Sequence, residues 1–426
     1  MRLPPKGSKS PRTSQPRAGD GPPRHRRPGR LVELPQIREV ADAALEAIGA
    51  AVEAHVRQNL SPRGGRQRPL AATHAGALTA LWRGFTVERA GRRQGYLAAA
   101  SARAAYLLYY TVTTAATTRV ALRMAADAGW RPRTATVDAP LRVLDLGAAS
   151  LGASLGVAAY LPDAAIEVVA LDSAAGALDD GRAVMATFAG ARVGVATARA
   201  DLRDAMALRR ARLGQFDLVV LANLINELPS GRNEEESAAA MLVERVMAEH
   251  LAPGGAVLIL EPATRVASRG IIALRRVLTE RAVVRVLAPC THEARCPLET
   301  TRDWCFFDLP WQRPKIVAAC DEVLGHGRTS LKASWLLLTP PLASASSRAT
   351  RFRIIGGTMQ HDGVVRRYLC GGEGRVVAVS ALSAAPPWLR HSSRGEPISL
   401  DTERARAVGR GGEVEIDVSA PSPQRA

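Results

Sequence analysis

Residues 141–156, LRVLDLGAASLGASLG, constrain the fold of this chain more than any other stretch. A short apolar run ends at the acidic Asp145, and a loop of small residues with Gly147, Gly152 and Gly156 follows. This pattern is typical of a parallel strand that turns into a helix, where glycines let the backbone approach a ligand and the helix N-terminus offers free N–H groups. It predicts either a cofactor loop or a tight strand–helix turn without a ligand.

Residues 139–280 alternate strand and helix patterns, which is typical of an α/β fold with a parallel sheet. Strands are expected at 142–146, 166–171, 192–197, 216–220 and 256–260, and a sixth at 333–338. Asp145, Asp172 and Asp201 end or follow the first three strands, and ligands bind at this edge of an open sheet. We expect Asp172 to accept hydrogen bonds from ribose hydroxyls, Asp201 to meet an adenine amino group, and Asp145 to face the methionine part of a ligand or to fix the loop. The predicted cofactor-binding residues are Asp145, Gly147, Gly152, Asp172 and Asp201.

This series resembles the class I methyltransferases that bind S-adenosylmethionine, and the segment LAPGGAVLILEP at 251–262 strengthens the likeness. A dinucleotide dehydrogenase is the alternative, but residues 147–152 lack the middle glycine of its Gly-x-Gly-x-x-Gly pattern. The methyltransferase pattern also prefers glycine at Ala149 and often at Leu151. We expect these two side chains to crowd the carboxypropyl end of the cofactor.

The segment LANLINELP at 221–229 follows the fourth predicted strand, where an acceptor would bind. Amino-group methyltransferases need a polar–Pro–Pro–aromatic turn at this place, and C5 methylation of a base needs a cysteine nucleophile. Neither occurs there, so the sequence assigns no catalytic residue. Asn223 and Glu227 are expected either to line the pocket or to cap the following helix.

Five cysteines in a chain without a secretory signal favour reduced thiols or metal ligands over disulfides. Cys290, Cys296 and Cys305 lie in PCTHEARCPLETTRDWC, and Cys370 lies in RRYLCGGEG. Four thiolates suit an iron–sulfur cluster or a structural zinc ion, and the alternative is a set of buried cysteines that act as small hydrophobic residues. Cys320 falls on a predicted helix at 315–324 and is expected to be the spare.

The formal net charge of +17 and the pI of about 10.7 favour a polyanionic partner, nucleic acid before membrane. Residues 1–30 contain nine Lys or Arg and one acid, which predicts a disordered basic arm, either a solvated tail or a contact for RNA phosphates. The N-terminus lacks an apolar signal segment, and the uncharged run at 104–118 is short for a membrane span. We expect a cytoplasmic protein without a membrane segment.

The predicted architecture is α/β: a Rossmann-like class I methyltransferase fold with an N-terminal helical region, a Cys-rich metal-binding loop and a small C-terminal β extension. The expected divisions are a disordered basic arm at 1–30, a helical region at 31–138, a Rossmann-like domain at 139–340 with a Cys-rich insertion at 284–313, a β extension at 341–385 and a loosely ordered tail at 386–426. The pattern indicates no oligomeric state.

The chain also resembles a known family, the methyltransferase-like proteins of the mitochondrial small ribosomal subunit and their bacterial relatives. The resemblance covers roughly residues 31–385 and rests on VLDLGAASLG, FDLVVLANLINELP, LILEPAT, PCTHEARCPL with RDWCFF, and KASWLLL followed by RRYLCGGEGRV. The Cys–His–Cys-Pro segment with the following Asp-Trp-Cys is the most specific of these motifs.

The resemblance implies a 4Fe-4S site carried by Cys290, Cys296, Cys305 and Cys370. It also implies binding to small-subunit ribosomal RNA during ribosome assembly or translation. The leading hypothesis is an S-adenosylmethionine-dependent methyltransferase that acts on this RNA. The alternative is a non-catalytic assembly factor that uses the methyltransferase fold to grip RNA.

Overall fold

The computed structural model describes residues 43–62, 68–86, 95–204, 206–228, 237–341, 351–372, 374–400, 405–407 and 414–419. The predicted basic arm at 1–30 lies outside the described residues.

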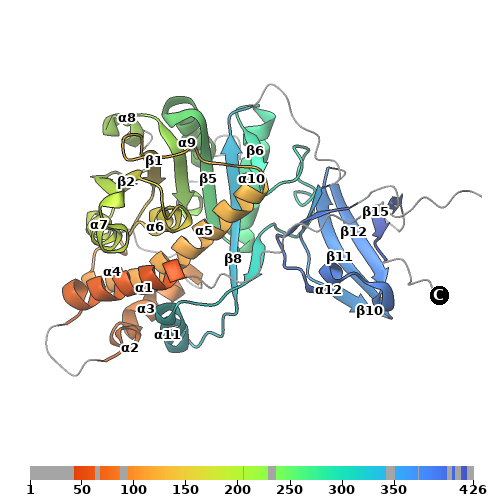
Figure 1. Ribbon diagram of the computed structural model, residues 1–426, viewed down its shortest axis with the longest axis horizontal. Coiled ribbons are helices and arrows are strands. Elements are labelled where there is room, and N and C mark those ends of the chain that lie inside the picture. Colours follow the sequence, from red (N-terminus) through yellow and green to blue (C-terminus); the bar gives the residue numbers. More distant parts are fainter. Residues whose placement is uncertain are drawn as a thin grey trace, which may run out of the picture. The chain divides into compact units, whose positions relative to one another are not determined.

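An eight-stranded mixed sheet carries the organising stretch of the sequence (Figure 1). Its strands are β1 (Leu141–Leu146), β2 (Ile166–Asp172), β3 (Val193–Arg199), β4 (Phe216–Ala222), β5 (Leu251–Pro262), β6 (Arg285–Ala288), β7 (Phe307–Pro310) and β8 (Ser330–Thr339). The order is β3-β2-β1-β4-β5-β8-β6, with β7 also paired to β8. Strands β1 to β5 run parallel and β8 runs antiparallel to β5. This confirms the predicted Rossmann-like α/β sheet, and the chain reverses its direction of winding between β1 and β4.

The first five predicted strands lie where the sequence indicates. Helix α9 spans Ala238–Arg245, a π-helical turn η6 (Val246–His250) follows, and β5 already begins at Leu251. The Pro-Gly-Gly of the LAPGGAVLILEP segment lies inside β5, where Gly254 has φ +77° and the pairing with β4 shifts register. The predicted sixth strand is β8, which pairs with β5 in the sheet.

Helices cover both faces of this sheet. Two successive residues of β1 illustrate this: Val143 packs into the hydrophobic core on one face of the sheet, and Leu144 packs into the core on the other face. Such strands read as continuous apolar runs. The helices of this part are α6 (Gly152–Tyr160), α7 (Ala175–Ala189), α8 (Ala207–Ala211), α10 (Arg265–Glu280) and α11 (Lys315–Leu324), with short 3-10 turns η4 (Gly190–Arg192) and η5 (Ile225–Glu227).

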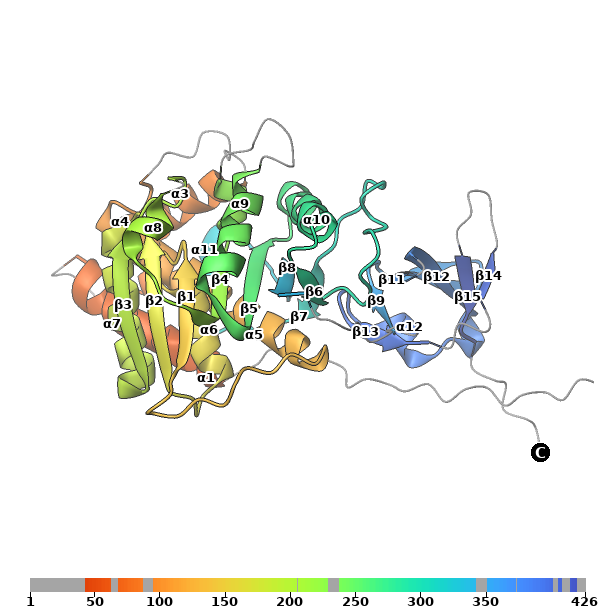
Figure 2. The same cartoon turned by 90° about the horizontal axis from the view of Figure 1, so that it is seen from above.

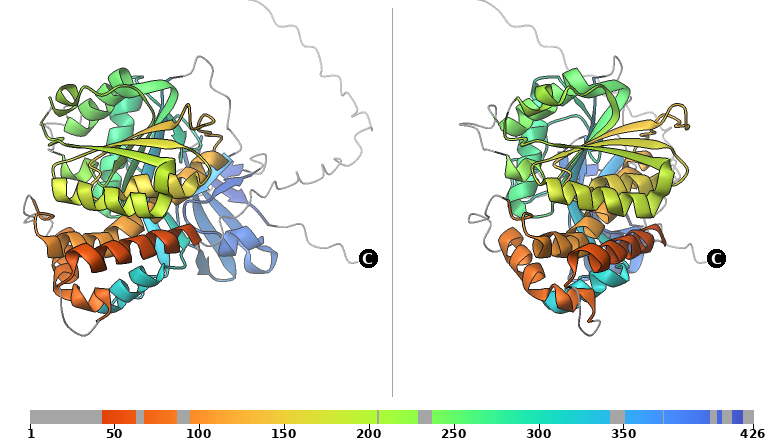
Figure 3. Two further views of the ribbon diagram at one scale, coloured as in Figure 1. Left: turned by 60° about the vertical axis from the view of Figure 1, so that its left-hand side comes forward. Right: turned by 90° about the vertical axis from the view of Figure 1, so that its left-hand side faces the viewer.

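The described residues of the predicted N-terminal helical region form a series of helices. It comprises α1 (Ala43–His55), η1 (Val56–Leu60), α2 (Leu70–Thr73), α3 (Ala75–Thr86), α4 (Ala100–Tyr106), the π-helical turn η3 (Leu107–Thr111) and α5 (Val112–Asp127). These helices share one hydrophobic core with α6 and with α11, which returns to them from later in the chain (Figure 3). Across the described residues, every helix is too short or too polar to cross a membrane.

Helix α6 packs so closely against η3 and α5 that glycine is required at the contact. A Cβ on Gly156 would lie 2.5 Å from the carbonyl oxygen of Ala115, and one on Gly152 would lie 2.9 Å from that of Thr111. Both distances are below any real carbon–oxygen contact of this kind. The packing of the helices therefore explains Gly152 and Gly156 without a ligand.

A second, seven-stranded sheet follows the first (Figure 2). Its strands are β9 (Arg351–Ile354), β10 (Met359–His361), β11 (Val364–Gly371), β12 (Gly374–Ala381), β13 (Pro397–Ser399), β14 (Ala405–Ala407) and β15 (Val414–Asp417), with η7 (Leu382–Ala384) and α12 (Pro387–His391) between them. The prediction of a loose tail from residue 386 is wrong for its described parts, because β13 pairs with β9 and β15 with β12. Apolar side chains explain this order, since Trp388, Ile398 and Ile416 are buried in the core of this sheet.

Candidate functional site

A cavity lies at the carboxyl ends of β1 and β4, where the winding of the sheet reverses. Ligands of open α/β sheets bind at this place. The lining residues are Tyr106, Thr111, Thr114, Asp145, Gly147, Ala148, Gly152, Ala153, Ala222 and Asn223. Three of the predicted residues, Asp145, Gly147 and Gly152, therefore border the cavity, together with the pocket residue Asn223.

Asp145 is the buried acid of this cavity, with 1% of its surface exposed. Its Oδ2 accepts hydrogen bonds from the Ser154 Oγ (2.6 Å) and backbone N–H (3.2 Å), whereas its Oδ1 is buried and has no hydrogen-bond partner. Burial raises the pKa of Asp145 to about 6, against the lowering effect of the Ser154 hydrogen bonds. A ligand that donates a hydrogen bond here would satisfy Oδ1, because buried polar atoms are almost always paired.

Replacing Asp145 by asparagine should remove a pH dependence of stability. The folded-state pKa of about 6 lies above the value near 4 of an unfolded aspartate, so the folded protein holds a proton that the unfolded chain loses between these values. The wild-type free energy of unfolding should therefore fall by about 2–3 kcal/mol between pH 4 and pH 7.5 on account of this group. Urea unfolding at both pH values checks this, and an equal fall in both proteins would contradict it.

Asp172 ends β2 and ties the glycine loop to the turn that follows the strand. Its Oδ2 accepts the backbone N–H of Ala149 at 2.9 Å, and its Oδ1 accepts that of Ala174 at 2.8 Å. Each carboxylate oxygen keeps a further lone pair. Asp172 therefore supports the loop and can still accept a hydroxyl from a bound ribose.

The loop between β1 and α6 differs from a glycine-rich cofactor loop at the two positions named from the sequence. Ala149 (φ 43°) and Leu151 (φ 59°) both adopt the left-handed conformation that glycine adopts more easily, and both side chains are buried. Leu224 packs against the same loop, since a Cβ on Gly147 would lie 3.0 Å from the Leu224 Cδ1. Leu151 packs into the core beside α7, and Ala149 packs with Leu97 and Ala177, so these side chains support the loop without lining the cavity.

The remaining predicted residues have separate surroundings. Asp201 is half exposed and forms a two-point ion pair with the Arg203 guanidinium (2.6 and 2.8 Å), whose hydrogen bonds lower the Asp201 pKa. Asn223 has φ 58°, and its Nδ2 lies 3.5 Å from the Thr114 Oγ1 at the cavity wall. Glu227 lies in η5, outside the residues that line the cavity. The structure thus brings Asn223, but neither Asp201 nor Glu227, into the lining.

Three lining residues come from the helical region, to which the sequence assigned no chemistry: Tyr106, Thr111 and Thr114. Burial, then the nearby Tyr96, Glu227 and Asp172, raise the pKa of Tyr106 well above its usual range, so its hydroxyl stays protonated. Thr111 closes the π-helical turn η3. Such turns often occur at functional sites, but the sequence pattern gives no sign of one here.

The four predicted metal-binding cysteines come together from two distant segments. Cys290, Cys296 and Cys305 lie between β6 and β7, and Cys370 lies in β11. Burial and then these three thiols raise the pKa of Cys370 well above its usual range. Burial and then Cys290 and Cys305 raise that of Cys296 to about 12. Cys296 and Cys370 therefore each lie within electrostatic reach of the other three thiols.

The fifth cysteine, Cys320, is fully buried on α11, where its Sγ lies 3.9 Å from the Leu108 carbonyl oxygen. His292 lies beside the thiols, with its Nε2 3.2 Å from the Cys370 Sγ. Burial, assisted by Arg275, lowers the pKa of His292 to about 4, so its imidazole is neutral at pH 7. Within the described ranges, no group of three or more His, Cys, Asp or Glu side chains has the arrangement of a metal site. Metal binding stays a prediction.

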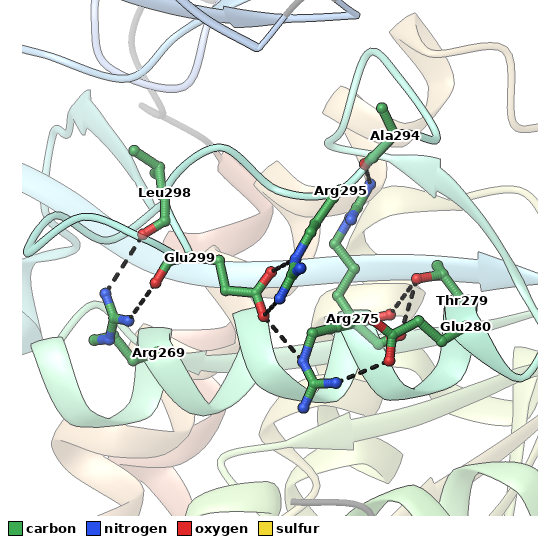
Figure 4. Close-up of polar contacts among 9 residues, drawn as sticks. Arg269, Arg275, Thr279, Glu280, Ala294, Arg295, Leu298 and Glu299 are labelled. Atoms are coloured by element: carbon green, nitrogen blue, oxygen red, sulfur yellow. Dashed lines mark hydrogen bonds and ion pairs between the residues drawn. The ribbon is translucent and has the colours of Figure 1, made fainter. Parts of the chain in front are cut away.

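Arginines of α10 hold the Cys-rich loop in place (Figure 4). The Arg269 guanidinium donates to the Glu299 carbonyl at 2.9 Å and to that of Thr301 at 2.7 Å. Arg275 donates to the Ala294 carbonyl at 2.8 Å, and Arg276 pairs with the Glu299 carboxylate at 2.9 Å. The protein itself therefore orders the segment that carries three of the cysteines.

Comparison with known proteins gives one family match. The family model described as mitochondrial small ribosomal subunit Rsm22 matches residues 100–378, which include the cavity and all four clustered cysteines. No curated protein matches the chain.

Several solved methyltransferase structures are similar to parts of the chain. TrmN from Thermus thermophilus is 18% identical over 55% of this chain and 53% of its own, with a TM-score of 0.32. Precorrin-6y C5,15-methyltransferase from Geobacter metallireducens is 14% identical over 58% of this chain and 92% of its own, with a TM-score of 0.30. A SAM-dependent methyltransferase from Geobacter sulfurreducens, in complex with S-adenosyl-L-homocysteine, is 16% identical over 54% and 90%, with a TM-score of 0.28.

Proposed function

Because the chain belongs to the family of the mitochondrial small ribosomal subunit protein Rsm22, we propose that it is an S-adenosylmethionine-binding, methyltransferase-like protein that acts on small-subunit ribosomal RNA. Its work would belong to ribosome assembly or translation, in the cytoplasm. The observation that carries the cofactor part is the unpartnered Oδ1 of Asp145, which borders a cavity at the switch point of a Rossmann-like sheet.

The residues at this edge of the sheet, in the cavity lining and outside it, fit this cofactor in chemistry. The Asp145 Oδ1 would accept a hydrogen bond from the methionine ammonium, and Asp172 would accept the ribose hydroxyls. Asp201 would meet the adenine amino group with the acceptor capacity that Arg203 leaves free. The bound cofactor supplies an electrophilic methyl group, and Asn223 and Tyr106 would orient the acceptor beside it.

We also propose that Cys290, Cys296, Cys305 and Cys370 hold a metal centre, a 4Fe-4S cluster or a zinc ion. Their convergence and the arginine-held loop support this, because four thiolates suit either centre. The centre would join the β6–β7 loop to β11 of the second sheet. Its binding energy would then contribute to folding.

The RNA partner is supported by charge and by family. The formal net charge of +17 favours a polyanion, and contacts with phosphates release counterions, so affinity should fall steeply with salt. The proposed basic arm at residues 1–30 would add to these contacts.

The loop between β1 and α6 favours a second candidate function, that of a non-catalytic assembly factor. Ala149 and Leu151 place side chains where glycines would leave room, and Leu224 packs against Gly147. A protein that uses the fold only to grip RNA during assembly would tolerate these side chains. The two functions differ in whether S-adenosylmethionine binds.

Calorimetric titration with S-adenosylmethionine tests the proposal. Asp172→Ala should weaken binding about tenfold or more, since a charge-assisted hydrogen bond contributes about 1.5–3 kcal/mol. Asp179→Ala is the matched control, because this acid of α7 is 65% exposed and pairs only at the surface with Arg182. Equal affinity of the Asp172→Ala and wild-type proteins would contradict the assigned ribose contact. No heat with the wild type at millimolar ligand would favour the non-catalytic function.

A further inference from the structure

Arg353 of β9 is a buried cation with no partner in the structure. Only 3% of its surface is exposed, and its Nε, Nη1 and Nη2 atoms are all buried without a hydrogen-bond partner. Burying an unpaired guanidinium is strongly unfavourable, so folded proteins match such a group with a negative charge. The residues beside Arg353 are therefore candidates for the matching negative charge.

The side chain of Arg353 lies beside the thiols. β9 pairs antiparallel with β11, and Arg353 is directly opposite Cys370, so the two side chains share one face of the sheet. Arg353 and Cys290 also line a common cavity. Trp335 lines the same cavity, and its Nε1 is a second buried donor without a partner. Two residues with unsatisfied buried donors therefore line the cavity that Cys290 also lines.

Arg275 is a second buried guanidinium at the same cluster, also 3% exposed. Its Nη2 donates to the carbonyl oxygens of His292 (3.3 Å) and Ala294 (2.8 Å), which lie between Cys290 and Cys296 in the loop. Its Nε has no hydrogen-bond partner. Arg394, a third arginine near Cys305, is partly exposed and faces the acidic Asp303 as well.

We propose that Arg353 and Arg275 supply the counter-charge of the four-thiolate metal centre, a role that rests on the proposed metal site. Four thiolates with a zinc ion, or with the dipositive core of an oxidised 4Fe-4S cluster, carry a net charge of about −2. Two buried guanidinium groups neutralise it. Arg353 is thus a positioning residue, which acts through the thiolates and does not bind the metal.

The test compares anaerobically purified Arg353→Met, Arg353→Lys and wild-type proteins. Arg351→Met is the matched control, because Arg351 lies on the same strand and lines the same cavity but donates to the Asp127 carbonyl. The rate of metal release to a chelator should rise about tenfold or more in Arg353→Met, since about 1.4 kcal/mol of lost charge pairing is a factor of ten. It should be intermediate in Arg353→Lys and unchanged in Arg351→Met. For an iron–sulfur centre, the reduction potential should also become more negative in Arg353→Met.

In the metal-free proteins, Arg353→Met should be stabilising. Without the centre, methionine removes an uncompensated buried charge, so apo Arg353→Met should melt about 2–4 °C above apo wild type. A merely structural arginine would give a lower melting temperature, and that result would overturn the inference. So would wild-type metal release in Arg353→Met. If wild-type protein takes up neither zinc nor an iron–sulfur cluster on reconstitution, the metal site itself is rejected, and the counter-charge role with it.

Discussion

Replacing Gly156 by alanine should destabilise the protein by at least about 2 kcal/mol. The added Cβ would lie 2.5 Å from the Ala115 carbonyl oxygen and 2.7 Å from the Thr118 Cβ, so α5 and α6 must move apart. The intrinsic helix preference of alanine over glycine, about 1 kcal/mol, acts in the other direction and is smaller than a clash with backbone. Because α5 carries Thr114 and α6 begins at Gly152, the movement should also open the cavity.

Gly270→Ala is the control for this experiment. Gly270 is exposed within α10, and a Cβ there would have nothing within 4 Å. Alanine should therefore stabilise the protein by about 0.5–1 kcal/mol. Urea unfolding of both variants measures the difference. Equal gains in stability would show that α5 and α6 do not pack as closely as described.

Replacing Cys370 by serine should abolish the proposed metal binding and expose the second sheet to protease. Structural zinc sites contribute apparent binding energies of about 10–16 kcal/mol, so losing one of four ligands should cost several kcal/mol of stability. The effect should centre on β9, β11 and β12, because Cys370 is the one clustered cysteine in that sheet. Metal analysis and limited proteolysis followed by mass spectrometry measure both effects.

Cys320→Ser provides the matched control. Its thiol is fully buried on α11, so a hydroxyl there should cost about 1–2 kcal/mol while the metal content stays unchanged. Loss of metal from Cys320→Ser, with retention in Cys370→Ser, would show that the fourth ligand is wrongly assigned.

The elements that the sequence predicts are those that local pattern specifies. Apart from the charged second residue of each strand (Arg142, Glu167 and Asp217), β1, β2 and β4 are apolar up to their ends because both faces of the sheet are covered. Each ends near a polar residue at the same edge. Cys290, Cys296 and Cys305 were likewise predictable as a group, because all three lie in the one loop between β6 and β7. Strands β13 and β15 were not predicted because each is short. Each is ordered by its pairing in the sheet, β13 with β9 and β15 with β12.

The chain by itself determined which residues can carry the chemistry, namely the acids at the strand ends and the four cysteines. Only the tertiary structure decided what surrounds them. Tyr106 reaches the cavity through the packing of α4 and η3, Gly152 is required by its contact with η3 and α5, and Arg353 meets Cys370 through the pairing of β9 with β11. These contacts join segments that are far apart in the sequence. The role of a buried side chain can be inferred only when its neighbours in the fold are known. A lone arginine in a strand reads as a surface residue, whereas the same arginine, buried and unpaired beside thiols, marks a charge that must be matched.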